Sequence, residues 1–283
     1  MRIVTPAKIN LTLEIVGKRP DGFHDLATWM LPIGLTDHLA IEEAPETSFT
    51  SNIPELGNDP SNLVIGAVEE FGRDSSIKSA YRISLEKKIP MGAGLGGGSS
   101  NAAGALRLLN RIHGDPLCET RLHKLAARLG SDVAFFVSPK SAWCTGRGEN
   151  LEPRDFPAGY YIFLAKPDFG VSTAGAYRAY ANLPLDKKRG EEQKTPWGML
   201  RNDLEPAVFP KYVLLPIIKK WMKRQAETLF SLMSGSGSTL FAVVKSRGDG
   251  ELLVDRFQIE FGRTIWTTVV ELNPPLARIS HAF

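Results

Sequence analysis

The stretch Pro90-Met-Gly-Ala-Gly-Leu-Gly-Gly-Gly-Ser-Ser-Asn-Ala102 decides the fold of this 283-residue chain. Five of the seven residues from Gly92 to Gly98 are glycine, which lets the backbone approach a ligand closely and adopt positive φ without strain. Free N–H groups at the start of a helix favour a bound phosphate, because the helix dipole adds positive charge there. The stretch therefore predicts a phosphate-binding loop, in which Ser99 or Ser100 caps the helix or binds a phosphate oxygen.

The residues after the glycines have the pattern of a helix packed on a core. Ala102, Ala105, Leu106 and Leu109 recur at a spacing of three to four residues, as on one buried helix face. A flexible glycine linker is the alternative. It is disfavoured because the glycines lie between a strand pattern and this amphipathic helix.

The loop differs from two better-known phosphate loops. It lacks the Gly-Lys-Ser/Thr of a Walker A loop. It matches G-x-G-x-x-G from Gly92 to Gly97, but Asp115, at the distance expected for a ribose-binding acid, lies in a turn sequence. Residues 119–129 then read as a second helix. The order strand, loop, helix, turn, helix favours a triphosphate over a nicotinamide dinucleotide.

The composition limits the class of protein. A net charge of +3 and a charged content of 23% are ordinary for a globular protein, and they predict no nucleic-acid or membrane partner. Cys118 and Cys144 lack pairing or metal spacing, and residues 1–6 lack a signal-peptide core, so a cytoplasmic location is expected. Isolated histidines read as packing or surface residues: His38, His113, His123 and His281.

Patterns along the chain predict the α+β class, because strands and helices are mixed without regular βαβ repeats. Residues 8–16 alternate as on a half-buried strand, and a turn follows at residues 17–22. A boundary near residues 153–158 would divide the chain into domains 1–155 and 156–283. The other expected elements are strands at Leu39–Glu42, Tyr81–Leu85, Ala142–Leu151 (interrupted by glycines) and Tyr160–Ala165, helices at Asn62–Phe71 (with Ser61 or Asp59 near its cap) and Ile217–Gln225, and a polar loop at Asp186–Thr195.

Three further features could carry chemistry. Lys8 is either a solvated lysine or a cation that stabilises charge on a reacting oxygen. Asp132 is either a helix or turn cap, or a carboxylate that accepts a proton from a substrate hydroxyl. The segment Ser234-Gly-Ser-Gly-Ser238 is either a tight turn or a second backbone segment that closes over the phosphates.

Together these motifs resemble the GHMP kinases, a family that includes galactokinase, homoserine kinase and mevalonate kinase. Three signatures occur in the family's order: Pro6-Ala-Lys-Ile-Asn-Leu11, the glycine loop with its two serines, and Ser234–Ser238. The resemblance runs from Met1 to about Leu272. It implies an α+β fold with a ribosomal-protein-S5-like N-terminal domain and a ferredoxin-like C-terminal domain.

Two more segments narrow the resemblance. Arg19-Pro-Asp-Gly-Phe-His24 and Leu129-Gly-Ser-Asp-Val-Ala-Phe-Phe136 resemble members that act on a cytidyl-diphosphate-linked sugar alcohol. The implied reaction is ATP-dependent phosphorylation of the C2 hydroxyl of the methylerythritol unit, a step of isoprenoid synthesis. The resemblance leaves the oligomeric state open.

The resemblance also implies roles for particular residues. Asp132 would be the general base, and Lys8 would lie beside it and offset charge on the transferred phosphoryl group. The substrate site would hold Asn10 at the acceptor and Phe23, His24 and Tyr177 around the cytosine, with Tyr177 preferred to Tyr180. The triphosphate of ATP would contact Pro90, Met91, Gly92, Ala93, Gly94, Leu95, Gly96, Gly97, Gly98, Ser99, Ser100, Ser234, Gly235, Ser236 and Gly237.

The chain departs from the family pattern at three points. Phe23 stands where many members have Tyr, so a ring can stack but a phenol hydrogen bond is lost. Ser131 stands where Ala is frequent. The acidic magnesium ligand of mevalonate kinases has no clear counterpart, so Mg²⁺ is expected with ATP while its protein ligands stay unassigned, with Glu149 a candidate.

Three alternatives remain open from the sequence. Another kinase of the family, of the homoserine or mevalonate type, would not need an aromatic set for a base. A non-catalytic sensor on the same fold would bind nucleotide and sugar without Lys8 or Asp132. An oxidoreductase would require nicotinamide binding at the glycine loop.

Overall fold

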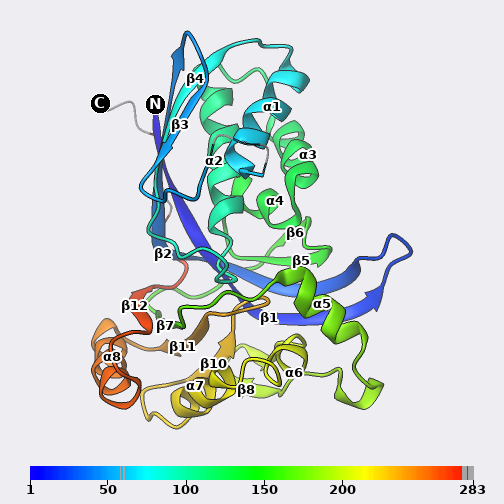
Figure 1. Cartoon of the computed structure of the whole chain (residues 1–283). Coiled ribbons are helices and arrows are strands. Elements are labelled where there is room, and N and C mark those ends of the chain that lie inside the picture. Colours follow the sequence, from blue (N-terminus) through cyan, green and yellow to red (C-terminus); the bar gives the residue numbers. More distant parts are fainter. Residues whose placement is uncertain (58, 60, 276–278, 280–283) are drawn as a thin grey trace.

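A long antiparallel hairpin runs through the computed structural model, which describes residues 1–57, 59, 61–275 and 279 (Figure 1). Its strands are β1 (Arg2–Lys18) and β2 (His24–Ala44), and they pair from Arg2 opposite Ala40 to Lys18 opposite His24. The turn predicted at residues 17–22 is therefore confirmed. The strands expected at residues 8–16 and 39–42 are parts of these two much longer strands.

The hairpin belongs to a six-stranded sheet in the order β3-β4-β2-β5-β6, with β1 on the other side of part of β2. Four helices cover one face of this sheet (Figure 1). The one strand expected at residues 142–151 is two strands, because Gly146 and Gly148 turn the chain. The elements are β3 (Ser48–Ser51), β4 (Ala80–Glu86), β5 (Ala142–Gly146), β6 (Asn150–Pro153), α1 (Leu63–Ser75), α2 (Gly97–Ile112), α3 (Glu119–Leu129) and α4 (Ser131–Val137).

The helix ends differ in part from the sequence expectations. The N-cap of α1 is Asn62, whose side chain accepts from Val64 N, and it lies next to Ser61, one of the two residues expected near the cap. Ser61 and Asp59 bond each other in the preceding turn instead. The helix α4 was not expected as an element, because seven residues are too short for a periodic pattern.

The second half of the chain forms a four-stranded antiparallel sheet in the order β10-β11-β7-β12. This is the strand order of the ferredoxin-like βαββαβ unit, as the family resemblance implied. Helices α7 and α8 pack on one face of it. The elements are β7 (Tyr161–Lys166), α5 (Thr173–Ala181), α6 (Glu205–Val208), α7 (Leu214–Lys223), β10 (Phe230–Met233), β11 (Leu240–Val244), α8 (Arg247–Phe261) and β12 (Trp266–Glu271).

The segment expected as a polar loop contains short regular elements. It holds the 3-10 turn η1 (Leu185–Lys187) and strand β8 (Gln193–Thr195), which pairs with β9 (Gly198–Leu200). Gln193 is buried because its side chain bonds the backbone of Ser231. The predicted domain boundary falls between β6 and β7, and the division into domains stays a prediction. His281 lies outside the described residues.

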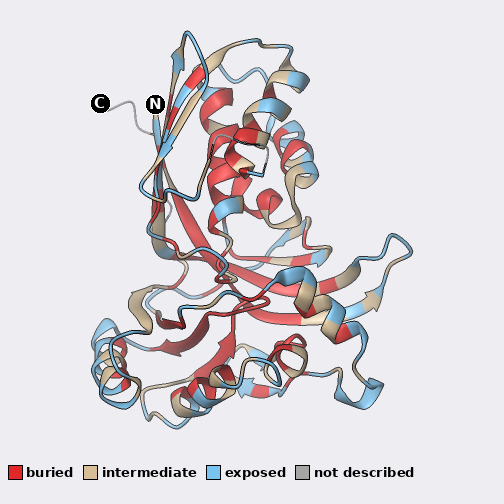
Figure 2. Ribbon diagram, viewed as in Figure 1, coloured by how far each residue is buried: buried red, intermediate tan, exposed pale blue. Residues whose placement is uncertain are grey.

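Residues 5–13 of β1 are buried on both faces of the strand, as Figure 2 shows, so the expectation of a half-buried strand was wrong for this part. The reason is that β1 lies between two layers. Ile9 and Leu11 pack against the four-stranded sheet in a shared core that includes Phe241. The polar residues that alternate with them face the helical layer and are also enclosed, with Lys8 only 3% exposed.

A register shift between Pro6 and Ala7 sets which side chains reach the helices. Before the shift, Thr5 accepts a hydrogen bond from Asn101 of α2. After it, Lys8 faces the same layer and reaches α4. Because side chains alternate along a regular strand, Thr5 and Lys8 would otherwise face opposite sides. The bulge therefore brings Lys8 to the helical side.

Close approach of α2 to β1 depends on Gly104. An added Cβ there would lie 2.5 Å from Thr5 Cγ2. We expect Gly104→Ala to lower the free energy of unfolding by about 1–3 kcal/mol, because the helix must move away from the strand. The control Gly98→Ala, whose Cβ would lie 3.7 Å from Leu63, should change it by less than about 1 kcal/mol. Equal unfolding midpoints in urea for the two variants would contradict this account.

Candidate active site

The glycine loop lies between β4 and α2, and three of its glycines adopt the left-handed backbone conformation. Gly92, Gly94 and Gly96 have φ of 61°, 73° and 70°. The helix begins at Gly97 with Gly96 as its N-cap and no side-chain cap. The expectation that Ser99 or Ser100 caps the helix is therefore wrong, because both lie inside its first turn. Their place as phosphate ligands stays a prediction.

The loop is held by its carbonyl groups, which leaves its N–H groups free. The carbonyls of Ala93, Gly94 and Leu95 accept from Thr239 N, Ser234 Oγ and Lys8 N. Among the described residues, the N–H groups of positions 91–96 donate no hydrogen bond. Unpaired N–H groups in front of a helix N-terminus suit an anion.

A buried ion pair anchors the start of α2. Lys87 Nζ donates to Asp37 Oδ2 at 2.5 Å, and both side chains are buried. Asn101 of α2 joins the pair, since its Nδ2 donates to the same carboxylate at 3.0 Å. An added Cβ on Gly97 would lie 2.9 Å from Lys87 Nζ, so the network lies directly behind the loop.

Lys8 and Asp132 meet beside the glycine loop. Lys8 Nζ lies 3.2 Å from Asp132 Oδ2 and donates to Asn10 Oδ1 at 2.6 Å. The Lys8 side chain is 4% exposed and that of Asp132 is 34% exposed, so the carboxylate is the member of the pair that a solute can reach. The neighbouring Cys144 is no nucleophile, because burial and the charge of Asp132 raise the pKa of its thiol to about 12.

The loop at residues 234–238 packs on the first glycine loop. Ser234 bonds Gly94 O, and an added Cβ on Gly94 would lie 2.2 Å from Ser234 O. An added Cβ on Gly235 would lie 3.7 Å from Lys8 Nζ. The structure thus brings together both loops and the Lys8–Asp132 pair, which come from four separate segments of the sequence.

The segment Asn202–Glu205 holds the second loop in place. Asn202 Nδ2 donates to Met233 O at 2.7 Å and to Gly235 O at 2.8 Å. Glu205 accepts from Met233 N, and burial raises the pKa of its carboxyl group. Asn202 Oδ1 also accepts from Leu204 N, and Leu204 is the N-cap of α6.

Aromatic side chains cluster at the turn of the β1–β2 hairpin. The rings of His24 and Tyr177 are stacked, with centroids 5.3 Å apart, and Tyr180 meets His24 edge-on at 5.8 Å. Burial, with smaller contributions from Lys18 and Lys188, lowers the pKa of His24. A neutral imidazole offers one donor and one acceptor. Phe23 is 54% exposed.

Two residues near these groups had no signal in the sequence. Thr173, at the start of α5, lies with its Oγ1 3.0 Å from Ser236 Oγ and so links the aromatic helix to the second loop. Arg147 lies in the β5–β6 turn with its guanidinium carbon 5.2 Å from the centre of the Phe23 ring. Neither contact is visible in sequence, because both join segments far apart in the chain.

A magnesium ion held by the protein would need several oxygen ligands close together. The described part of the chain contains no group of three or more His, Cys, Asp or Glu side chains that could hold a metal ion. The carboxylate of Glu149 accepts from Arg147 N within its own turn. Buried hydroxyls without a partner do lie at the loops, on Ser100 and Thr239. These residues suit a Mg²⁺ ion that is bound to phosphate oxygens better than one that is held by several protein carboxylates.

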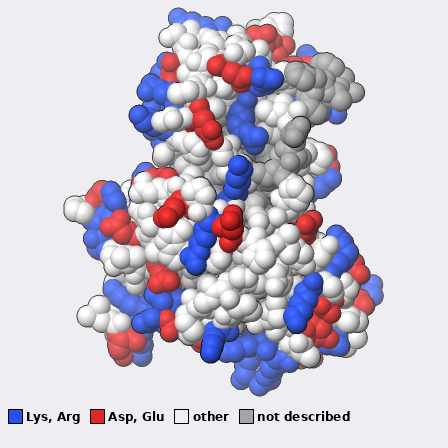
Figure 3. All heavy atoms as spheres, turned by 180° about the vertical axis from the view of Figure 1, so that it is seen from behind, with Lys and Arg blue, Asp and Glu red and all other residues white. Residues whose placement is uncertain are grey.

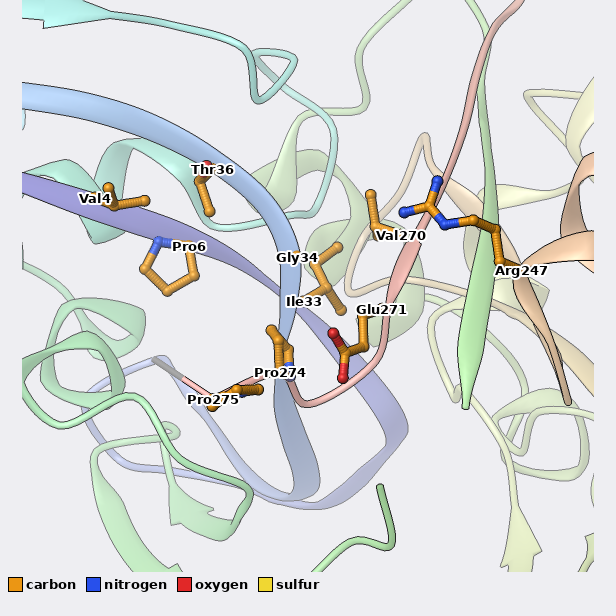
Figure 4. Close-up of a pocket in the computed structure, with 10 residues that line it drawn as sticks. All are labelled: Val4, Pro6, Ile33, Gly34, Thr36, Arg247, Val270, Glu271, Pro274 and Pro275. Carbon is orange, nitrogen blue, oxygen red and sulfur yellow. The ribbon is translucent and has the colours of Figure 1, made fainter. Parts of the chain in front are cut away.

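A separate hollow of about 320 Å³ lies between the two sheets (Figure 4). Val4 and Pro6 of β1 line it together with Glu271, Arg247 and the two prolines after β12. None of the site residues named from the sequence lines it. The surface seen from behind carries both signs of charge (Figure 3). Within the described residues, no helix has the length and apolarity needed to cross a membrane.

Comparison with known proteins agrees with this architecture. The profile of the GHMP kinases N terminal domain matches residues 62–140, and that of the GHMP kinases C terminal domain matches residues 195–263. The chain therefore belongs to the GHMP kinases.

Within that family, the chain is 42% identical to a 4-diphosphocytidyl-2-C-methyl-D-erythritol kinase of Methylacidiphilum infernorum, over 94% of this chain and 95% of the relative. A crystal structure of 4-(cytidine 5'-diphospho)-2C-methyl-D-erythritol kinase superposes with a TM-score of 0.79 at 30% identity, covering 97% of this chain and all of that chain. A homoserine kinase of Cytophaga hutchinsonii, 18% identical with a TM-score of 0.73, shares the fold over 96% of this chain and 94% of its own.

The position of the second loop should depend on Asn202. We expect Asn202→Ala to raise the KM for ATP and to lower the free energy of unfolding by about 1–3 kcal/mol, because two buried carbonyls lose their donor. Asn182→Ala is the control, since Asn182 is exposed and its side chain makes no hydrogen bond with the described residues. Unchanged ATP kinetics in Asn202→Ala would contradict a role in holding the loop.

Proposed function

We propose that the protein is an ATP-dependent kinase that phosphorylates the C2 hydroxyl of 4-diphosphocytidyl-2-C-methyl-D-erythritol, a step of the non-mevalonate isoprenoid pathway. The observation that carries the proposal is the 3.2 Å contact between Lys8 and Asp132 beside the two glycine-containing loops at residues 90–100 and 234–238. The similarity to kinases of that name supports the choice of substrate. The two free cysteines are compatible with the cytoplasm as its location.

The triphosphate of ATP binds to the glycine loop in this proposal. The free N–H groups of residues 91–96 and the N-terminus of α2 face its oxygens, and the loop at residues 234–237 closes over them. Mg²⁺ bound to the nucleotide would neutralise part of the phosphate charge. The unpaired hydroxyl of Ser100 supplies a further donor at the start of α2.

The acceptor hydroxyl lies at Asp132. The carboxylate takes the proton of the hydroxyl, while the Lys8 ammonium offsets the negative charge that develops on the transferred group. Lys8 is held by Asn10, whose own Nδ2 donates to Thr28 Oγ1 at 2.8 Å, so the ammonium keeps one position. Asp132 thus acts on the acceptor hydroxyl, and Lys8 acts on the phosphoryl group that is transferred to it.

The cytosine end of the substrate binds at the hairpin turn. The ring of Phe23 stacks on the base, neutral His24 pairs with its polar edge, and Tyr177 supports the histidine. A kinase of the homoserine or mevalonate type has no base to bind, so the aromatic cluster favours the cytidyl substrate. Labelled ATP and a panel of acceptors (the cytidyl substrate, homoserine and mevalonate) test this choice directly.

The general-base role predicts the behaviour of Asp132→Asn. Turnover should fall by about 10²–10⁴-fold, because an amide cannot accept the proton. ATP affinity, measured by fluorescence or calorimetry, should change little, since the carboxylate lies outside the phosphate loop. Asp115→Asn, on the distant α2–α3 turn, is the control. Near-wild-type turnover in Asp132→Asn would show that the base is another group.

The stacking role predicts a selective effect of Phe23→Ala. The KM for the cytidyl substrate should rise about tenfold, because a base loses about 1–3 kcal/mol of stacking free energy, while the KM for ATP stays near the wild-type value. Leu185→Ala, at an 87% exposed position, serves as the matched surface control. An equal rise in both KM values would argue against a base pocket at the hairpin turn.

A further inference from the structure

Three cationic side chains flank the aromatic cluster. Lys18 and Lys188 act electrostatically on His24, and Arg147 lies over the ring of Phe23. The substrate of the proposed function has cytosine at one end and the acceptor alcohol at the other. Its two negatively charged phosphates must therefore lie between the aromatic cluster and Asp132.

One side of the β5–β6 turn is next to the residues that bind the base in the proposed function. Gly146, the last residue of β5, pairs with Leu26 of β2, two residues after His24. Arg147 follows directly, and its guanidinium carbon lies 5.2 Å from the centre of the Phe23 ring. The turn thus begins beside the residues that hold the base.

The other side of the same turn is next to the Ser131–Asp132 segment, where the acceptor hydroxyl lies in the proposed function. An added Cβ on Gly148 would lie 3.9 Å from Ser131 Cβ, and Ser131 directly precedes Asp132. Arg147 is therefore bounded by the base pocket on one side and by the segment of the catalytic carboxylate on the other. Of the three cations, Lys188 lies instead over Tyr180, 5.3 Å from its ring centre.

The guanidinium of Arg147 has free donors. Its side chain makes no hydrogen bond with the described residues, and its nearest carboxylate oxygen, on Glu149, is 3.6 Å from Nε. The side chain is 31% exposed. A planar guanidinium can keep its face on an aromatic ring while its edge binds two oxygens of a phosphate. Arg147 is arranged for both contacts.

We propose that Arg147 binds the diphosphate of the cytidyl substrate and selects for it over cytidine compounds that lack it. The proposal rests on the proposed function. It assigns a specificity role to a residue of the β5–β6 turn, separate from the phosphate loops that bind ATP. Glu149 accepts from the backbone N–H of Arg147, and its other carboxylate oxygen lies 3.6 Å from the guanidinium Nε.

Calorimetric titration with cytidine, CMP and CDP tests the proposal, with a non-hydrolysable ATP analogue occupying the glycine loop. In the wild-type protein the affinity should rise along that series. Arg147→Ala should weaken CDP binding about tenfold while cytidine binding stays unchanged, because only the phosphate contact is lost. The affinity of Arg147→Lys for CDP should lie between those of the wild-type protein and Arg147→Ala, since lysine keeps the charge but lacks the paired donors.

Lys188→Ala is the matched control and should weaken CDP binding less than Arg147→Ala does. Equal losses for cytidine and CDP in Arg147→Ala would mean that the arginine only supports Phe23, which overturns the proposal. So would unchanged CDP binding in that variant. If the wild-type protein binds CDP no better than GDP, the proposed substrate itself is wrong, and this inference fails with it.

Discussion

The burial of Lys8 is the constraint on which the site depends. A lysine that is 3% exposed on a central strand must have an anion or strong acceptors close by, because an isolated ammonium in a protein interior is very costly. Asp132 and Asn10 meet that need. The same carboxylate is 34% exposed, so the pair that balances a buried charge also presents a base to a solute.

Polar clusters keep the two loops in contact with that pair. The Asp37–Lys87–Asn101 network lies behind the first loop, and the Asn202–Glu205 segment holds the second. In both, buried polar side chains bond backbone or charged groups, so losing one member removes hydrogen bonds from its neighbours. The carbonyls of the first loop accept from residues distant in sequence, and the N–H groups of residues 91–96 remain available for an anion.

The α+β class, the ferredoxin-like strand order and the helices α1, α2, α3 and α7 follow from the sequence patterns and the family resemblance. Expectations failed where packing overrides local pattern. The alternation at residues 8–16 predicts a half-buried strand, yet both layers of the fold cover it. The serines after the glycines have the chemistry of caps, yet the positive φ of Gly96 already starts the helix. In the site, motif residues were predictable, whereas Thr173 and Arg147 were not.

The sequence by itself predicted the phosphate loop from its glycines, and the family resemblance singled out Asp132 and Lys8 as the candidate base and its lysine. Only the tertiary structure decided that Lys8 reaches Asp132, after the register shift between Pro6 and Ala7, and that the β5–β6 turn lies between Phe23 and the Ser131–Asp132 segment. The physical reason is that a motif specifies local backbone and chemistry. Distances between segments more than a hundred residues apart depend on how two sheets pack against each other.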